Sequence, residues 1–186
     1  MRTLAVTQNI TLDGSIELLD GWFSPPTDVD AADDLLEESR RQDSASDALL
    51  LGRRTFEDFR SYWPLQHGDP TGIADYLDRV DKYVISSTLT ETGWGNSTIL
   101  DGDPVEQVGA LKERPGRDIV ATGSISLCHS LIEAGLVDEF RLFVYPAVQG
   151  RGRRLFPDGY VRTGLRLLES TAFRGDILFT RYAAPS

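Results

Sequence analysis

The chain has 186 residues, a length that fits one domain, and we expect residues 1–186 to form a single one. Its formal net charge of −10 argues against a nucleic-acid partner, which would require a basic face. No apolar run approaches the roughly 20 residues that cross a membrane, and a lone cysteine cannot form an intramolecular disulfide. We therefore expect a soluble, cytoplasmic protein without a membrane or nucleic-acid partner.

Predicted strands and helices alternate through most of the chain. Apolar runs predict strands at residues 4–10, 48–51, 83–85, 119–121 and 140–145. Apolar spacing and capping residues predict helices at 29–43, 55–62, 104–114 and 124–134. Prolines and glycines predict a surface loop at 63–72. Two closing strands, 165–173 and 177–182, are expected to pair in antiparallel fashion around Gly175–Asp176.

Some helix boundaries carry specific signals. Asp103 precedes Pro104 and is the expected N-cap of its helix. Either Ser124 or Ser126 is expected to cap the next helix, which Gly135 should end. The inward stripe of the first helix is predicted to consist of Val29, Ala32, Leu35, Leu36 and Ser39.

This order of elements is typical of an α/β fold. We expect one mixed sheet, mostly parallel with antiparallel C-terminal strands, and helices on both faces. In such sheets, ligands bind beyond the carboxyl ends of the strands. The residues that follow Leu51, Ile85 and Ala121 are therefore the first candidates for a site.

The first of these strand ends has the sequence GRRTFEDF at residues 52–59. Gly52 closes a buried strand, and a helix begins at once with Arg53, Arg54 and Thr55. A helix N-terminus presents free backbone N–H groups and a partial positive charge, and guanidinium groups bind phosphate well. The segment is a candidate phosphate site, and the alternative is a plain turn with solvated arginines.

Two more strand ends carry similar features. ISSTL at residues 85–89 offers hydroxyl groups for a phosphate or a ribose, although such residues are also common in loops. ATGSISLCHSLIEAG at 121–135 places Gly123 before a helix, where a ligand could approach the backbone closely. Neither segment is a G-x-G-x-x-G fingerprint or a P-loop. Three such strand ends side by side suit one extended, phosphate-bearing ligand such as a dinucleotide.

The chain resembles the dihydrofolate-reductase-like superfamily. The resemblance is carried by VTQNITLDGSI (6–16), ALLLGRRTFEDF (48–59), KYVISSTL (82–89) and DIVATGSISLCHSLIEAGLVDEFRLFVYPAVQGRGRRLF (118–156). It is strongest to the C-terminal reductase domain of riboflavin-biosynthesis deaminase/reductases and its stand-alone relatives. The most specific piece ends in a Pro-x-x-x-Gly-x-Gly turn at Pro146, Gly150 and Gly152. The resemblance covers nearly the whole chain and implies NADPH as the cofactor.

The resemblance also implies roles for individual positions. Those matching the pyrophosphate and part of the 2′-phosphate are Gly52, Arg53, Arg54 and Thr55. Those matching the adenosine ribose and its 2′-phosphate are Ser86, Ser87 and Thr88. The other side of the pyrophosphate matches Gly123, Ser124, Ile125, Ser126 and Leu127. The loop near the nicotinamide matches Leu12, Asp13 and Gly14. Arginine beside a ribose phosphate favours NADPH over NADH.

The chain departs from the pattern at two places. The family usually has a Gly-Gly pair where this chain has Gly123–Ser124, so a Cβ is added at the closest approach. Dihydrofolate reductases also carry an acid on the first helix, where this chain offers Asp33, Asp34, Glu37 and Glu38. Periodicity places Asp33 at the edge of the inward stripe and favours it, the alternative being four solvated carboxylates. Asp13 or Asp33 is expected to orient the substrate or relay a proton.

Residues outside these motifs are assigned expected roles as follows. We expect no metal site, because the candidate ligands lack a suitable spacing: His67, Cys128 and His129. Cys128 is expected to be a small core residue. Trp22 is expected to cover the substrate mouth or to pack. A cluster that is either solvated or binds an anionic substrate or acidic partner consists of Arg151, Arg153 and Arg154.

Three functions follow. The leading one is an NADPH-dependent reductase that resembles 5-amino-6-(5-phosphoribosylamino)uracil reductase and transfers a hydride to a small heterocyclic or ribosyl substrate. The second is a dihydrofolate or pterin reductase, and the third is a non-catalytic nucleotide-binding protein. We also expect a homodimer, in which the apolar strand at residues 140–148 pairs or packs with a second copy.

Overall fold

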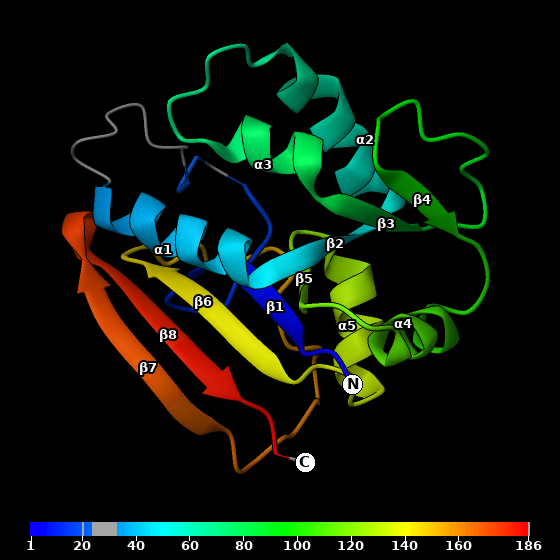
Figure 1. The fold of residues 1–186 in the computed structure, drawn as a ribbon. Coiled ribbons are helices and arrows are strands. Elements are labelled where there is room, and N and C mark those ends of the chain that lie inside the picture. Colours follow the sequence, from blue (N-terminus) through cyan, green and yellow to red (C-terminus); the bar gives the residue numbers. More distant parts are fainter. Residues whose placement is uncertain (20, 24–32, 186) are drawn as a thin grey trace.

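Eight strands form one mixed sheet in the computed structural model, which describes residues 1–19, 21–23 and 33–185 (Figure 1). In chain order they are β1 (Leu4–Thr11), β2 (Ser46–Gly52), β3 (Asp81–Ile85), β4 (Ser97–Leu100), β5 (Asp118–Ala121), β6 (Glu139–Tyr145), β7 (Arg166–Phe173) and β8 (Ile177–Ala183). Across the sheet the order is β4-β3-β2-β5-β1-β6-β8-β7. All pairs from β4 to β6 are parallel, and β8 pairs with β6 and β7 in antiparallel fashion. The expected α/β sheet is confirmed.

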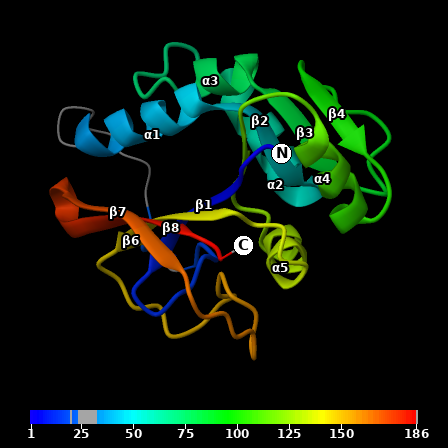
Figure 2. The ribbon, with the colours of Figure 1, turned by 60° about the horizontal axis from the view of Figure 1, so that its bottom comes forward.

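Helices cover both faces of this sheet, as expected (Figure 2). They are α1 (Asp33–Ala45), α2 (Arg53–Tyr62), α3 (Ile73–Arg79), α4 (Pro104–Glu113) and α5 (Ile125–Glu133). On one face, Leu51 packs in a core with Phe56 of α2 and Leu77 of α3. On the other, Leu50 packs in a core with residues of α4 and α5, including Leu131. The run at 48–51 is apolar throughout because β2 is covered on both sides.

Helix α1 packs through a more polar face than the sequence suggests. Its buried residues are Leu36, Glu38 and Gln42, whereas Ser39 of the expected stripe is only half-buried. Gln42 Nε2 donates to Glu38 Oε1 at 2.7 Å, and Thr7 Oγ1 donates to Gln42 Oε1 at 3.1 Å. The helix therefore meets a hydroxyl of β1 and buries hydrogen-bonded polar groups in response. Two expected members of the stripe lie outside the described residues: Val29 and Ala32.

Two elements were not expected from the sequence. Helix α3 follows the segment predicted as a loop, which also contains a short 3₁₀ turn at Trp63–Leu65. Its start is organised by Asp69, whose carboxylate accepts hydrogen bonds from the backbone N–H groups of Thr71 and Ala74. Strand β4 has four residues and pairs only with β3 at the sheet edge. None of the described helices is long and apolar enough to cross a bilayer.

Strand β6 is paired on both of its edges, with β1 on one side and β8 on the other. It cannot extend the sheet into a second copy, so the pairing form of the expected homodimer is wrong. Packing of this region against a second copy stays a prediction. The neighbouring hairpin exposes apolar side chains, because Leu167 of β7 is 50% exposed and Leu178 of β8 is 43% exposed.

Candidate functional site

The carboxyl ends of β2 and β5 bring two of the predicted segments together. The backbone N–H of Gly52 donates to Ser124 Oγ at 2.9 Å, and the backbone N–H of Ser124 donates to Thr55 Oγ1 at 2.9 Å. These reciprocal bonds join the start of α2 to the start of α5. We call Gly52, Thr55, Gly123 and Ser124 the cradle. Two helix N-termini are thereby held side by side, an arrangement that favours an anion.

The backbone of the cradle is left-handed at two successive residues. Gly123 has φ of +56° and Ser124 has φ of +49°. A Cβ on Gly123 would lie 2.9 Å from Thr55 Cγ2, so this position requires glycine. Ser124 stands at the N-cap of α5, but its hydroxyl makes no cap bond there. Ser124 is thus the N-cap residue, one of the two expected, but its Oγ accepts from Gly52 rather than from an N–H of α5, and Ser126 lies inside the helix.

Gln8 of β1 is part of this arrangement and was not expected from the sequence. Its Nε2 donates to the Gly123 carbonyl at 2.8 Å, and its Oε1 accepts from the Gly123 N–H at 3.2 Å. The side chain is buried, with 5% exposure. A signal did exist, because Gln8 interrupts the inward-facing alternation of Leu4, Val6 and Ile10.

The two arginines of α2 differ in their contacts. Arg53 Nη1 lies 3.0 Å from Glu57 Oε2, one helical turn further on. Arg54 is exposed, and its guanidinium has no ion pair or hydrogen bond within the described residues. The positive charge of Arg54 is therefore the one free to meet a phosphate.

The hydroxyl residues after β3 also divide into two kinds. Ser86 is buried, and its Oγ accepts from the backbone N–H groups of Thr88 and Leu89 at 3.2 and 2.9 Å. It shapes the turn. Ser87 and Thr88 are exposed, and they follow Ile85, the register partner of Gly52. Their hydroxyl groups lie at the strand end beside the cradle.

Asp13 holds a turn beyond β1 through three hydrogen bonds. Its carboxylate accepts from Thr11 Oγ1 at 2.6 Å and from the backbone N–H groups of Gln149 and Gly150 at 3.1 and 2.7 Å. These bonds, led by the one from Thr11, lower the pKa of Asp13 to about 2. At neutral pH Asp13 is a carboxylate, suited to orienting groups rather than to donating a proton.

The neighbours of Asp13 present backbone and apolar surface. Leu12 is 66% exposed, and its N–H donates to the Ala147 carbonyl at 2.8 Å. Gly14 has φ of +86°, and its N–H donates to the Thr11 carbonyl, which closes the expected turn. Leu12 thus offers an apolar side chain at the carboxyl edge of the sheet.

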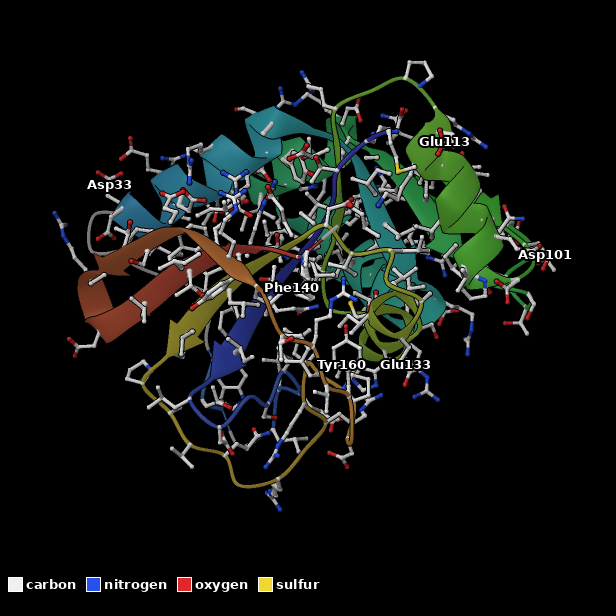
Figure 3. All side chains as sticks on the ribbon, turned by 90° about the horizontal axis from the view of Figure 1, so that it is seen from below. Asp33, Asp101, Glu113, Glu133, Phe140 and Tyr160 are labelled. Carbon is white, nitrogen blue, oxygen red and sulfur yellow. The ribbon has the colours of Figure 1, made fainter. Side chains whose placement is uncertain are left out.

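The first described turn of α1 carries the other candidate acids. Asp33 is exposed at the end of α1 that lies toward the β7–β8 turn (Figure 3). Asp34 Oδ2 accepts from the backbone N–H of Arg174 in that turn at 2.9 Å. Asp34 therefore ties the helix to the hairpin, and the proton-relay role of Asp33 stays a prediction.

Three aromatic rings gather at the carboxyl end of β6. The Tyr145 ring lies 5.6 Å from both the Trp22 and the Phe23 ring centroids, in edge-on contact. Trp22 Nε1 also donates to the Glu17 carbonyl, so this tryptophan packs. Burial raises the pKa of Tyr145 to about 12, and its hydroxyl stays protonated at neutral pH.

A pocket of about 450 Å³ lies between α5 and the loop after β6. Its lining includes His129, whose Nε2 is 2.8 Å from the Arg154 carbonyl, and the expected arginine cluster. Arg153 of that cluster is paired with Glu17. The cradle does not line this pocket. We place the candidate site at the cradle because hydrogen-bonding groups from several strand ends converge there.

The Sγ atom of Cys128 donates a weak hydrogen bond to the Gly123 carbonyl of the cradle at 3.4 Å. Cys128 is fully buried in the core, as expected, and burial raises its pKa to about 12, so it is a thiol. In the part of the chain that the structure describes, no three His, Cys, Asp or Glu side chains are grouped to hold a metal ion.

A second pocket, of about 630 Å³, lies at the amino edge of β2 between α1 and α3. Asp43 lines it, and burial raises the pKa of this carboxyl from 3.8 to about 6, against the opposing effect of Arg79. The folded state therefore disfavours ionised Asp43. This penalty is fully present above pH 6 and absent below about pH 4.

Asp43→Asn is accordingly expected to raise the free energy of unfolding at pH 7.5 by about 1–2 kcal/mol, allowing for partial solvent screening. At about pH 4 the variant should match the wild type. Urea denaturation at both pH values measures the effect, with Asp75→Asn as an exposed control from the same pocket. An equal gain at both pH values would contradict the titration of Asp43.

The sheet order and the strand-end site define a dihydrofolate-reductase-like fold, and solved structures share it. A putative riboflavin biosynthesis protein from Shewanella sp. PV-4 matches with a TM-score of 0.71 and 20% identity, covering 99% of both chains. A pyrimidine reductase-like protein from Corynebacterium diphtheriae matches with a TM-score of 0.68 and 17% identity, over 100% of this chain and 92% of that one. A Thermotoga maritima deaminase/5-amino-6-(5-phosphoribosylamino)uracil reductase matches with a TM-score of 0.67 and 16% identity, over 99% of this chain but 57% of its own length.

The chain belongs to the RibD C-terminal domain family, which matches residues 2–179. It is also 33% identical over 184 residues to the uncharacterized protein YyaP of Bacillus subtilis (strain 168), covering 95% of this chain and 92% of that protein. The family is one of reductases related to riboflavin biosynthesis. The chain is thus assigned to the reductases, as the sequence motifs indicated.

Proposed function

We propose that the protein is an NADPH-dependent reductase that transfers a hydride to a small heterocyclic or ribosyl substrate. The reaction would resemble that of the 5-amino-6-(5-phosphoribosylamino)uracil reductase named for the Thermotoga relative. The observation that carries the proposal is the cradle, where the starts of α2 and α5 are joined by reciprocal hydrogen bonds. Paired helix N-termini at the carboxyl edge of a sheet suit the pyrophosphate of a dinucleotide.

The residues present fit such a cofactor. The first turn of α5, at Ile125, Ser126 and Leu127, leaves N–H groups without intrahelical partners. Gly52 and Gly123 keep the backbone accessible, and a Cβ on Gly52 would already be in contact with Ser124 at 3.7 Å. Exposed Arg54, Ser87 and Thr88 supply a charge and hydroxyl groups for a 2′-phosphate.

When bound, NADPH supplies the hydride, and the protein supplies binding and orientation. Asp13 fixes the loop that carries the exposed apolar side chain of Leu12, which would pack against the nicotinamide ring. The protonated hydroxyl of Tyr145 can donate a hydrogen bond to a substrate at the end of β6. These residues restrict the approach of the substrate, which is a large part of catalysis in hydride transfer.

Calorimetric titration with NADPH and NADH tests the proposal. The wild type should bind NADPH more tightly, and Arg54→Gln should weaken NADPH binding about tenfold while leaving NADH binding unchanged. Arg53→Gln is the matched control and should have a smaller effect, because Arg53 is engaged by Glu57. Failure of the wild type to bind either dinucleotide would contradict the proposal.

A second candidate is a nucleotide-binding protein without catalysis. It is favoured by Asp13 being held as a carboxylate and by the exposed position of Asp33, since neither is set to deliver a proton. Loss of NADPH absorbance with a pyrimidine, a pterin or dihydrofolate as substrate separates the candidates. Turnover of dihydrofolate would favour a folate reductase, and binding without any turnover would favour the non-catalytic protein.

A further inference from the structure

We propose that Gln8 is a positioning residue that fixes the backbone of Gly123, on both sides of its Cα atom, for dinucleotide binding. This inference rests on the proposed function and extends it to a residue of β1 for which the sequence motifs implied no role. Gln8 touches neither the proposed phosphates nor the substrate region. It acts through its hydrogen bonds to Gly123, which is a member of the cradle.

The contacts of Gln8 are specific to a primary amide. Its Nε2 donates to the Gly123 carbonyl at 2.8 Å, while its Oε1 accepts from the N–H of the same residue at 3.2 Å. One side chain therefore satisfies both polar groups of one residue. Nε2 also lies 3.6 Å from Cys128 Sγ, in the first turns of α5. A buried amide that makes hydrogen bonds to both the N–H and the carbonyl of one residue restricts the backbone dihedral angles of that residue.

The backbone conformation of Gly123 matters because it sets the direction in which α5 begins. Gly123 is followed by Ser124, whose N–H is held by Thr55 and whose Oγ is held by Gly52. The chain of contacts from Gln8 to Gly52 thus links the interior of β1 to the carboxyl ends of β5 and β2. A change at Gln8 would alter the direction in which the first N–H groups of α5 point.

Two substitutions separate positioning from simple packing. Gln8→Met keeps the length and volume of the side chain but removes the partner of the Gly123 N–H and leaves the Gly123 carbonyl with the weak hydrogen bond from Cys128 Sγ at 3.4 Å. Gln8→Glu replaces the donating amide nitrogen with a carboxylate oxygen, which faces the Gly123 carbonyl without a proton. When that carboxyl group is protonated, it again donates to the carbonyl and accepts from the N–H, as the amide does.

The experiment measures the Kd for NADP⁺ from pH 5 to pH 8, always as a ratio to the wild type at the same pH. Gln8→Met should weaken binding by roughly 10- to 100-fold at every pH, because the Gly123 N–H loses its partner and the Gly123 carbonyl loses the stronger of its two donors. Gln8→Glu should be as weak at pH 8 and recover toward the wild type as the pH falls. Recovery of this kind would not arise from a packing defect.

The matched control is Gln42→Met. Gln42 is also buried, with 8% exposure, and also makes two hydrogen bonds, but it lies on α1 away from the cradle. Its Kd for NADP⁺ should equal that of the wild type at every pH. Should Gln8→Met fail to fold, the pH series of Gln8→Glu tests the inference alone.

The outcomes distinguish a failure of the proposed role of Gln8 from a failure of the proposed function. Wild-type binding together with unimpaired binding by Gln8→Met overturns the role of Gln8 and leaves the proposed function intact. A Gln8→Glu variant that is weak and does not recover at low pH overturns the role of the donated hydrogen bond. No binding by the wild type at any pH overturns the proposed function, and the role of Gln8 with it.

Discussion

Gly123→Ala is expected to weaken NADP⁺ binding at least about 100-fold and to lower the free energy of unfolding by about 2–4 kcal/mol. The added Cβ would lie 2.9 Å from Thr55 Cγ2 and 3.2 Å from Thr55 Oγ1. The φ of +56° adds strain for any residue with a Cβ. The start of α5 must therefore move away from α2, which separates the two helix N-termini. Calorimetric titration and urea denaturation measure the two effects.

Thr55→Ser tests whether the contact with the Thr55 methyl group causes the destabilisation by Gly123→Ala. It removes the methyl group that the new Cβ would meet but keeps the hydroxyl that accepts from the Ser124 N–H. The double variant Gly123→Ala/Thr55→Ser should therefore recover about half of the lost unfolding free energy, because the backbone strain and the 3.2 Å approach to the retained hydroxyl remain. Gly135→Ala is the control, since Gly135 has φ of +67° and no atom lies within 4 Å of its added Cβ. If Gly123→Ala cost no more than Gly135→Ala, the close approach would not explain the cradle.

Lys82→Ala is expected to lower the free energy of unfolding by about 4–5 kcal/mol, the largest loss of stability among these variants. Lys82 is completely buried in β3. Its Nζ donates to the carbonyls of Leu77 and Val80 at 2.6 and 3.0 Å and lies 4.6 Å above the Trp94 ring. The ammonium group therefore joins the end of α3 to the loop before β4.

Lys82→Met separates the part of this stability loss that comes from the ammonium contacts from the part that comes from the cavity. Methionine keeps most of the stem volume, so its expected cost of about 2–3 kcal/mol reports the unpaired carbonyls and the lost cation–π contact. The further loss in Lys82→Ala reports the cavity. Urea denaturation of both variants measures the division. A Lys82→Met variant as stable as the wild type would mean that desolvation of the ammonium group cancels its contacts.

Sequence reasoning succeeded where local chemistry decides the structure. Asp103 caps α4 as expected, because its Oδ1 accepts from the backbone N–H groups of Val105 and Glu106 at 2.9 and 3.1 Å. Gly135 ends α5 as expected, with a positive φ and an N–H that donates to the Ile132 carbonyl at 3.0 Å. Such signals span only a few residues, so one stretch of sequence contains all of the interacting groups.

The elements that escaped prediction are those with little local signal. Helix α3 has seven residues and follows Gly72, which gives it no side-chain cap. Strand β4 has the sequence STIL, which shows neither an alternating pattern nor the continuous apolar run that predicted the equally short β5. Both are stabilised by contacts to other parts of the chain, as the burial of Leu77 and Leu100 in the two cores shows.

The candidate site also combines features with a local sequence signal and features that depend on long-range contacts. The rule that ligands bind beyond strand ends identified the segments at 52–55 and 123–127, which the structure brings together. The sequence could not reveal that Gln8 contacts Gly123, because 115 positions separate them. Nor could it distinguish Arg53 from Arg54, since the difference depends on which side chain reaches Glu57.

The position of β1 in the middle of the sheet also constrains how the protein is made. Its partners β5 and β6 begin at Asp118 and Glu139, so β1 pairs only with strands that are synthesised much later. Closing such long loops is slow, because chain entropy must be lost before the contacts form. During synthesis, β2 and β3 can pair with each other while β1 remains without a neighbour. The cradle, which needs β1, β2 and β5 together, is therefore completed only after β5 and the start of α5 have been synthesised.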